Sequence, residues 1–182
     1  MKSQENFIGW DFAYEWFLDA QYRYDNSSEY PQLQAFGDFS SIPSGAVWNG
    51  TTDINWTGSG IKNDPYFISS AAELAGLAET VNSGVSYSGI YFKLTTDIVL
   101  NNTQSLYWQH NAVQWNPIGN LPNYFKGIFD GDGHTVSGIY INSLGNYKGL
   151  FGAVNSGTIK NIRVIESRIK GTQNVGGISG IV

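Results

Sequence analysis

The sequence contains no cysteine, only two histidines among its 182 residues, and few charged side chains, at 14% of the total. The absence of cysteine excludes a disulfide scaffold and thiolate metal sites, and two histidines exclude a histidine-rich metal centre. No apolar run approaches the ~18 residues of a membrane-spanning helix, and the N-terminus lacks the apolar core of a signal peptide. We therefore do not expect membrane insertion. We also do not expect nucleic-acid binding, because the sequence has no basic patch of the size that it requires.

Glycine is abundant, at 22 residues, and aromatic side chains make up 15% of the chain. The apolar fraction of 41% argues against disorder, and there is no Gly-X-Y period of collagen. Many Gly, Asn, Ser and Thr residues accompany β-branched and aromatic ones. This composition favours short strands joined by tight turns.

A repeat in the second half of the chain decides the fold class. Residues 125–141 read FKGIFDGDGHTVSGIYI, and residues 147–164 read YKGLFGAVNSGTIKNIRV. Gly149 follows Gly127 by 22 residues, and Gly177 follows Gly149 by 28. Three apolar matches between the two units fall at a spacing of 23, and they join Val136 to Ile159, Ile139 to Ile162, and Ile141 to Val164.

Each unit consists of apolar residues that follow a glycine, a polar turn, and a short strand in which apolar and polar residues alternate. Such a unit has no helix to cover it, so it must stack on copies of itself, strand over strand. The sequence therefore predicts a mainly β solenoid, a parallel β-helix with coils of about 22–28 residues. Arg163 would point outward, and the inward positions would be Phe129, Val136, Ile139, Ile141, Leu150, Ile159, Ile162 and Val164.

The segments GLFG, at 149–152, and GISG, at 177–180, resemble the GLUG motif, a repeat of bacterial cell-surface proteins. The resemblance covers about residues 58–182, because NDPYFISSAAELAGLAETVNSG and WNPIGN resemble the segments that open such arrays. It implies a right-handed β-helix in an adhesin-like surface or secreted protein, and similar repeats accompany immunoglobulin-cleaving metallopeptidases. Its structural positions here are Gly127, Gly149, Leu150, Gly152, Gly177, Ile178 and Gly180.

One helix is expected, over about residues 70–82. Ser70 and Glu73 form a capping box, and Gly84 stands where a helix commonly ends. An apolar stripe from Leu74 to Val81 would cap the open N-terminal end of the solenoid. The next segment, 91–100, alternates as a strand whose Phe92 and Leu94 face the same side.

Residues 1–44 differ from the rest of the chain, with seven acidic residues against two basic ones. This aromatic-rich segment resembles the closing coil of a preceding array, so we divide the chain into 1–44 and 45–182. The chain would then be a fragment of a longer protein. Its two incomplete ends suggest self-association through the open ends of the β-helix, by strand addition.

The stretch DGDGH, at 130–134, resembles a metal-binding or catalytic site more than any other segment of the chain does. We interpret it as a structural turn, because the equivalent GAVNSGT keeps the glycine but has neither the carboxylate pair nor the histidine. The alternatives are a calcium site and an acid/base pair at Asp130 and Asp132. No EF-hand glutamate follows, so no metal or other cofactor is expected.

Other candidate sites are sparse. The HExxH spacing of metallopeptidases and the nucleophile elbow of hydrolases are both absent. The segment YWQHNAVQW reads as an irregular insertion, and its Trp108 and His110 are our candidate ligand-binding residues. We expect Trp10, Trp16, Trp56 and Trp115 to fill the core, and Trp108 to be exposed.

The sequence favours a non-catalytic module at the cell surface or in a secreted protein. It would bind a glycan or a host or matrix protein, or serve as a stalk. The alternatives are a fragment of a carbohydrate-active β-helix enzyme, such as a lyase or glycoside hydrolase, and an accessory module of a surface metallopeptidase.

Overall fold

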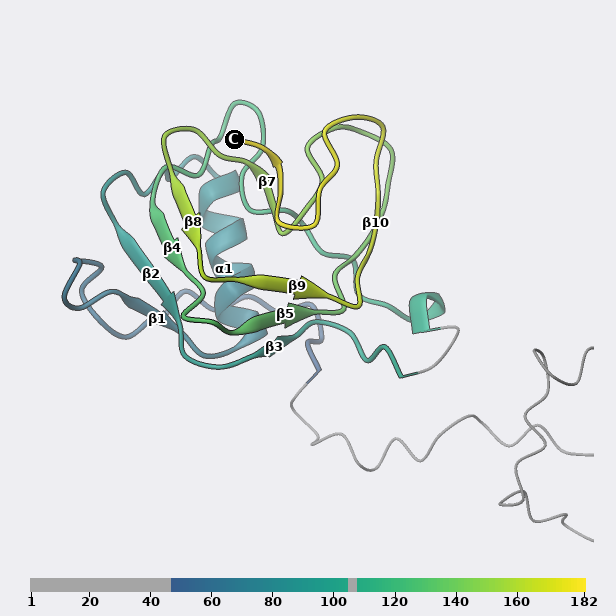
Figure 1. Cartoon of the computed structure of the whole chain (residues 1–182), viewed down its shortest axis with the longest axis horizontal. Helices are drawn as coiled ribbons and strands as arrows, with labels where there is room; N and C mark the ends of the chain where they lie inside the picture. The colour runs from purple at the N-terminus through teal and green to yellow at the C-terminus, as the bar shows by residue number, and fades with distance from the viewer. Residues whose placement is uncertain (1–46, 105–107) are drawn as a thin grey trace, which may run out of the picture. The chain divides into compact units, whose positions relative to one another are not determined.

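A computed structural model describes residues 47–104 and 108–182 of the chain (Figure 1). The segment 1–44, its resemblance to a closing coil, and the expected burial of Trp10 and Trp16 lie outside the described residues. In chain order the elements are β1 (Tyr66–Ile68), α1 (Ala71–Asn82), β2 (Tyr91–Leu94), β3 (Ile98–Val99), the 3-10 helix η3 (Trp108–His110), β4 (Ile128–Asp130), β5 (Thr135–Ser137), β6 (Tyr140–Asn142), β7 (Phe151–Ala153), β8 (Thr158–Lys160), β9 (Arg163–Ile165), β10 (Arg168–Lys170) and β11 (Ser179–Ile181).

The described residues are mainly β, with one α-helix and short strands in small parallel sheets. One sheet has the order β1-β2-β4-β8 and another the order β3-β5-β9, while β6 pairs with β10 and β7 with β11. Every pairing between these strands is parallel. Figure 1 shows β2, β4 and β8 running side by side, and β3, β5 and β9 doing the same below them. The expected fold class is confirmed at this level.

The register between the last two units differs from the one that we predicted. Val136 pairs with Val164 and not with Ile159. Ile159 instead pairs with Phe129, and Ile141 pairs with Ile169. The spacing of 23 is therefore wrong, while the spacing of 28 between Gly149 and Gly177 agrees with the pairing of β7 and β11.

The physical reason lies in the spacing of the apolar residues in the last unit. Ile159, Val164 and Ile169 follow one another at equal intervals, and each is the centre of a three-residue strand. Sliding the unit by one interval therefore keeps an apolar residue against an apolar residue. Hydrophobic matching does not choose between the two registers.

The helix matches its sequence signals. The main-chain N–H of Glu73 donates to Ser70 Oγ at 3.2 Å, and the N–H of Ser70 donates to Glu73 Oε2 at 3.0 Å, which completes the capping box. Gly84 follows the C-terminus with a φ of +110°, where a side chain would be strained. Leu74, Leu77, Ala78 and Val81 are buried in the same core as the strands.

The core consists of side chains from successive units. Phe92 of β2 and Phe129 of β4 are register neighbours, and both are at most 1% exposed. Phe151 packs edge-on against Phe129 with the ring centroids 5.2 Å apart. The predicted inward positions from Phe129 to Leu150 are fully buried, whereas Ile159, Ile162 and Val164 in the last unit are partly buried. Arg163 is exposed, as expected.

The glycines of the GLUG-like segments differ in how tightly they are packed. Gly149, Leu150 and Gly152 are buried, and a Cβ on Gly152 would lie 2.3 Å from the carbonyl oxygen of Gly119. Gly127 is also confined, because a Cβ there would lie 3.0 Å from main-chain oxygens of two earlier residues. Gly177 and Ile178 are exposed and Gly180 is half-buried. A Cβ on Gly180 would nevertheless lie 2.7 Å from the carbonyl oxygen of Asn174, whereas one on Gly177 would meet only Val164 Cγ1 at 4.0 Å. Gly152 and Gly180 therefore require glycine for close main-chain approach, and Gly177 does not.

Candidate ligand-binding cleft

The DGDGH stretch forms the turn between β4 and β5. Asp132 and Gly133 both have positive φ, +50° and +86°, as a tight turn requires. The main-chain N–H of Asp132 donates to Asp130 Oδ1 at 3.0 Å, which closes the turn locally. This geometry agrees with the interpretation of the stretch as a structural turn.

Each carboxylate of this turn has its own lysine partner. Asp130 pairs with Lys160 of β8 at 2.9 Å, and Asp132 pairs with Lys93 of β2 at 2.9 Å. The two lysines belong to the strands on either side of β4, so the carboxylates tie their unit to both neighbours rather than converge on one point. Among the described residues no three potential metal ligands cluster together.

His134, the remaining titratable residue of the stretch, contacts a carboxylate of an earlier turn. Its Nδ1 lies 3.2 Å from Asp97 Oδ1, which also accepts the main-chain N–H of Thr135 at 2.8 Å. Hydrogen bonds from Thr135 lower the pKa of Asp97, and His134 adds to the effect. Burial alone would raise the pKa of Asp130, but hydrogen bonds from Lys160, Asp132 and Asn161 outweigh it, so that pKa is also lowered.

These lowered pKa values predict that the fold loses stability in acid. A carboxyl group whose folded pKa is depressed stabilises the fold above its unfolded pKa, about 3.9, and that contribution disappears as the pH falls toward the folded value. We expect Asp130→Asn to have a lower urea midpoint than wild type at pH 7, and the difference to shrink toward pH 2. A difference that stays constant from pH 7 to pH 2 would show that the ionised carboxylate contributes nothing.

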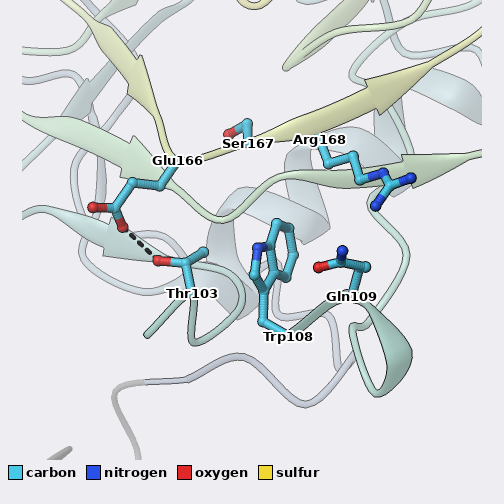
Figure 2. A pocket seen from close by; sticks show the side chains of 6 residues that line it. All are labelled: Thr103, Trp108, Gln109, Glu166, Ser167 and Arg168. Atoms are coloured by element: carbon cyan, nitrogen blue, oxygen red, sulfur yellow. Dashed lines mark hydrogen bonds between the residues drawn. The ribbon is translucent and has the colours of Figure 1, made fainter. Parts of the chain in front are cut away.

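A separate cleft lies where η3 faces the connection between β9 and β10. It has a volume of about 400 Å³ and is lined by Thr103, Trp108, Gln109, Glu166, Ser167 and Arg168. Figure 2 shows Glu166 on one side of the Trp108 ring and Arg168 on the other. The lining thus combines an aromatic ring, two opposite charges and polar groups from two segments that are far apart in the sequence.

Hydrogen bonds fix the main chain of the segment that carries Glu166 and Arg168. The N–H of Arg168 donates to the Ile139 carbonyl at 2.8 Å, and the N–H of Ile139 donates to Ser167 Oγ at 3.1 Å. The Thr103 hydroxyl donates to the Glu166 carboxylate across the cleft wall. These contacts hold Glu166 and Arg168 on a turn that is bonded to the preceding unit.

Trp108 is half-buried and its orientation is set by a neighbouring ring. It packs against Tyr140 with centroids 5.7 Å apart and an interplanar angle of 72°. Trp108 is thus less exposed than we expected. Trp115 is 3% exposed and Trp56 packs against the core, both as predicted. His110, the other candidate, is exposed at the end of η3 and does not line the cleft.

Two polar groups of the cleft have unused bonding capacity. No carboxylate of the described residues forms an ion pair with Arg168. The side-chain oxygen of Gln109 is buried, and no described residue donates a hydrogen bond to it. A buried polar atom without a partner costs free energy, but a molecule in the cleft cannot contact this oxygen, so the guanidinium of Arg168 is the group available to a ligand.

Sequence reasoning found Trp108 but missed Glu166, Arg168 and Gln109. The signal in the sequence was the ESR segment at 166–168, which runs from the turn after β9 into the first residue of β10 and places opposite charges close together. That signal becomes informative only with the observed register, which sets β10 beside β6 and hence beside Tyr140.

Comparison with known proteins gives partial matches. A "Putative Gly-rich membrane protein" of Evansella cellulosilytica is 35% identical over 107 residues, which are 58% of this chain and 11% of that protein. "Halomucin" of Haloquadratum walsbyi is 32% identical over 130 residues, which are 69% of this chain and 1% of that protein. The chain thus matches a small part of each relative. No protein-family model and no solved structure matches it.

Among the described residues, no helix has the length and apolar character that crossing a bilayer requires.

Proposed function

We propose that the chain is a non-catalytic, ligand-binding module of a cell-surface or secreted protein, built as a right-handed parallel β-helix. The β-helix is supported by the exclusively parallel pairing of the named strands. It is also supported by three consecutive pairings, β5 with β9, β6 with β10 and β7 with β11, which all have the same offset along the chain. A constant offset is what stacked coils produce. The glycine motif, which resembles GLUG, agrees with this architecture.

The surface location is supported by the names of the two relatives, a Gly-rich membrane protein and halomucin. Both are far longer than the segment that matches, as expected of a module within a large protein.

The observation that carries the binding function is the cleft at Trp108. It places an aromatic ring between a carboxylate and a guanidinium that has no carboxylate partner among the described residues (Figure 2). Its volume of about 400 Å³ lies within the range of roughly 300–1,000 Å³ that is usual for small-ligand sites. A glycan fits these features best, because sugars present both an apolar face and hydroxyl donors.

The competing function is glycoside cleavage by a β-helix enzyme. It would need two convergent carboxylates. Asp130 and Asp132 instead bind lysines on opposite neighbouring strands, and this geometry favours a structural role.

The test applies the full chain to a glycan array and then assays the bound glycan for released reducing sugar. We expect binding without turnover, binding lost in Trp108→Ala, and binding retained in His110→Ala, which changes an exposed neighbour outside the cleft. Turnover that Asp130→Asn abolishes would establish the enzyme instead. Neither binding nor turnover would leave a stalk.

A further inference from the structure

The chemistry of the cleft specifies its ligand more closely than a glycan in general. Resting on the proposed function, we infer that the cleft binds a carboxylated sugar, a uronic-acid residue, with its carboxylate on Arg168, its hydroxyls on Glu166, and its apolar face on Trp108. Each of these three contacts follows from a separate property of the lining residues.

Arg168 supplies the site for the carboxylate. Its main-chain N–H is bonded to Ile139, so the position of the residue is fixed, while its guanidinium has no carboxylate partner among the described residues. A guanidinium presents parallel N–H donors that match the two oxygens of a carboxylate. Arg168 is also the only Lys or Arg among the six lining residues. A single cation suits a singly charged acid.

Glu166 restricts the charge that the ligand can carry. It lies on the opposite side of Trp108 from Arg168, as Figure 2 shows, and the Thr103 hydroxyl is its hydrogen-bond donor in the cleft. A carboxylate accepts several hydrogen bonds, so Glu166 can still bind hydroxyl donors. Its negative charge disfavours phosphate or polysulfate, which would place additional anionic groups near it. The cleft thus has one end for an anion and one end for hydroxyls.

Trp108 favours a sugar ring over an acidic peptide. Its aromatic ring offers a flat apolar surface to the cleft. A uronic acid carries its carboxylate and several hydroxyls around one rigid ring whose C–H faces can stack. A peptide carboxylate ends a flexible chain, which must be ordered on binding at an entropic cost.

The experiment compares acidic sugars with their neutral esters on the full chain. The probes are trisaccharides of galacturonic and of glucuronic acid, each with its carboxyl methyl ester, titrated while the indole N–H signals are followed by NMR. We expect at least one acid to bind tenfold or more tightly than its ester. Arg168→Gln should remove this preference and keep the ester affinity, Trp108→Ala should abolish both, and Arg163→Gln, an exposed arginine outside the cleft, should change neither.

The outcomes separate this inference from the proposed function. Equal binding of acids and esters, both lost in Trp108→Ala, would overturn the carboxylate assignment and leave a neutral-glycan module. Equal binding of a triglutamate peptide and the acidic sugars would also overturn it, in favour of an acidic peptide. Absence of binding by these probes and by every glycan of the array would overturn both proposals.

Discussion

Replacing Phe129 with alanine is expected to lower the free energy of unfolding by about 3–5 kcal/mol. The side chain is fully buried at the centre of β4, between its register partners Phe92 and Ile159. Its ring also meets Phe151 edge-on at 5.2 Å. Truncation would remove contacts to three other strands, β2, β7 and β8, at once, and the surrounding strands are bonded into sheets that cannot collapse fully into the cavity.

The matched control is Leu144→Ala, because Leu144 is 83% exposed. A surface truncation of this kind changes stability by less than about 0.5 kcal/mol. Urea denaturation followed by circular dichroism gives both values. Similar midpoints for the two variants would contradict the placement of Phe129 between neighbouring units.

Gly152→Ala should lower the free energy of unfolding by about 1–3 kcal/mol. The added Cβ would lie 2.3 Å from the carbonyl oxygen of Gly119, well inside van der Waals contact. That carbonyl cannot move away freely, because it accepts the N–H of Ala153, while the N–H of Gly152 donates to Ile118. The clash would therefore separate two hydrogen-bonded segments of main chain.

Gly177→Ala is the control from the same glycine motif. The nearest atom to its added Cβ is Val164 Cγ1 at 4.0 Å, an ordinary contact. We expect little change, or a gain of about 0.4–1 kcal/mol from the stiffer unfolded chain. Thermal unfolding of the two variants tests the difference, and equal losses at both positions would show that the motif glycines are not distinguished by packing.

Local signals in the sequence predicted several elements correctly. The capping box of Ser70 and Glu73 set the start of α1, because it depends only on neighbouring residues. The alternation of Phe92 and Leu94 gave the buried face of β2 in the same way. These features could be predicted because their physical cause lies within one turn of helix or one strand.

Features that depend on long-range pairing were predicted less well. The register slipped by one apolar interval, because Ile159, Val164 and Ile169 are equivalent as apolar partners. The cleft was not predicted because of that error, since Glu166 and Arg168 face Trp108 only when β10 lies beside β6. Periodicity correctly predicted strands in small parallel sheets. Hydrophobic matching between neighbouring units carried no information about the turns between the strands.

The register that pairs β6 with β10 is the claim on which both the stacked coils and the cleft depend, and engineered cysteine pairs test it directly. Asn142 and Lys170 are exposed Cα partners of these two strands, at the ~4.8 Å spacing of paired strands, which a disulfide can bridge. The chain has no cysteine of its own to interfere. Asn142→Cys with Lys170→Cys should oxidise to an intramolecular disulfide, whereas Asn142→Cys with Ile165→Cys, at the rejected spacing of 23, should stay reduced. A disulfide in the second pair and none in the first would contradict the register.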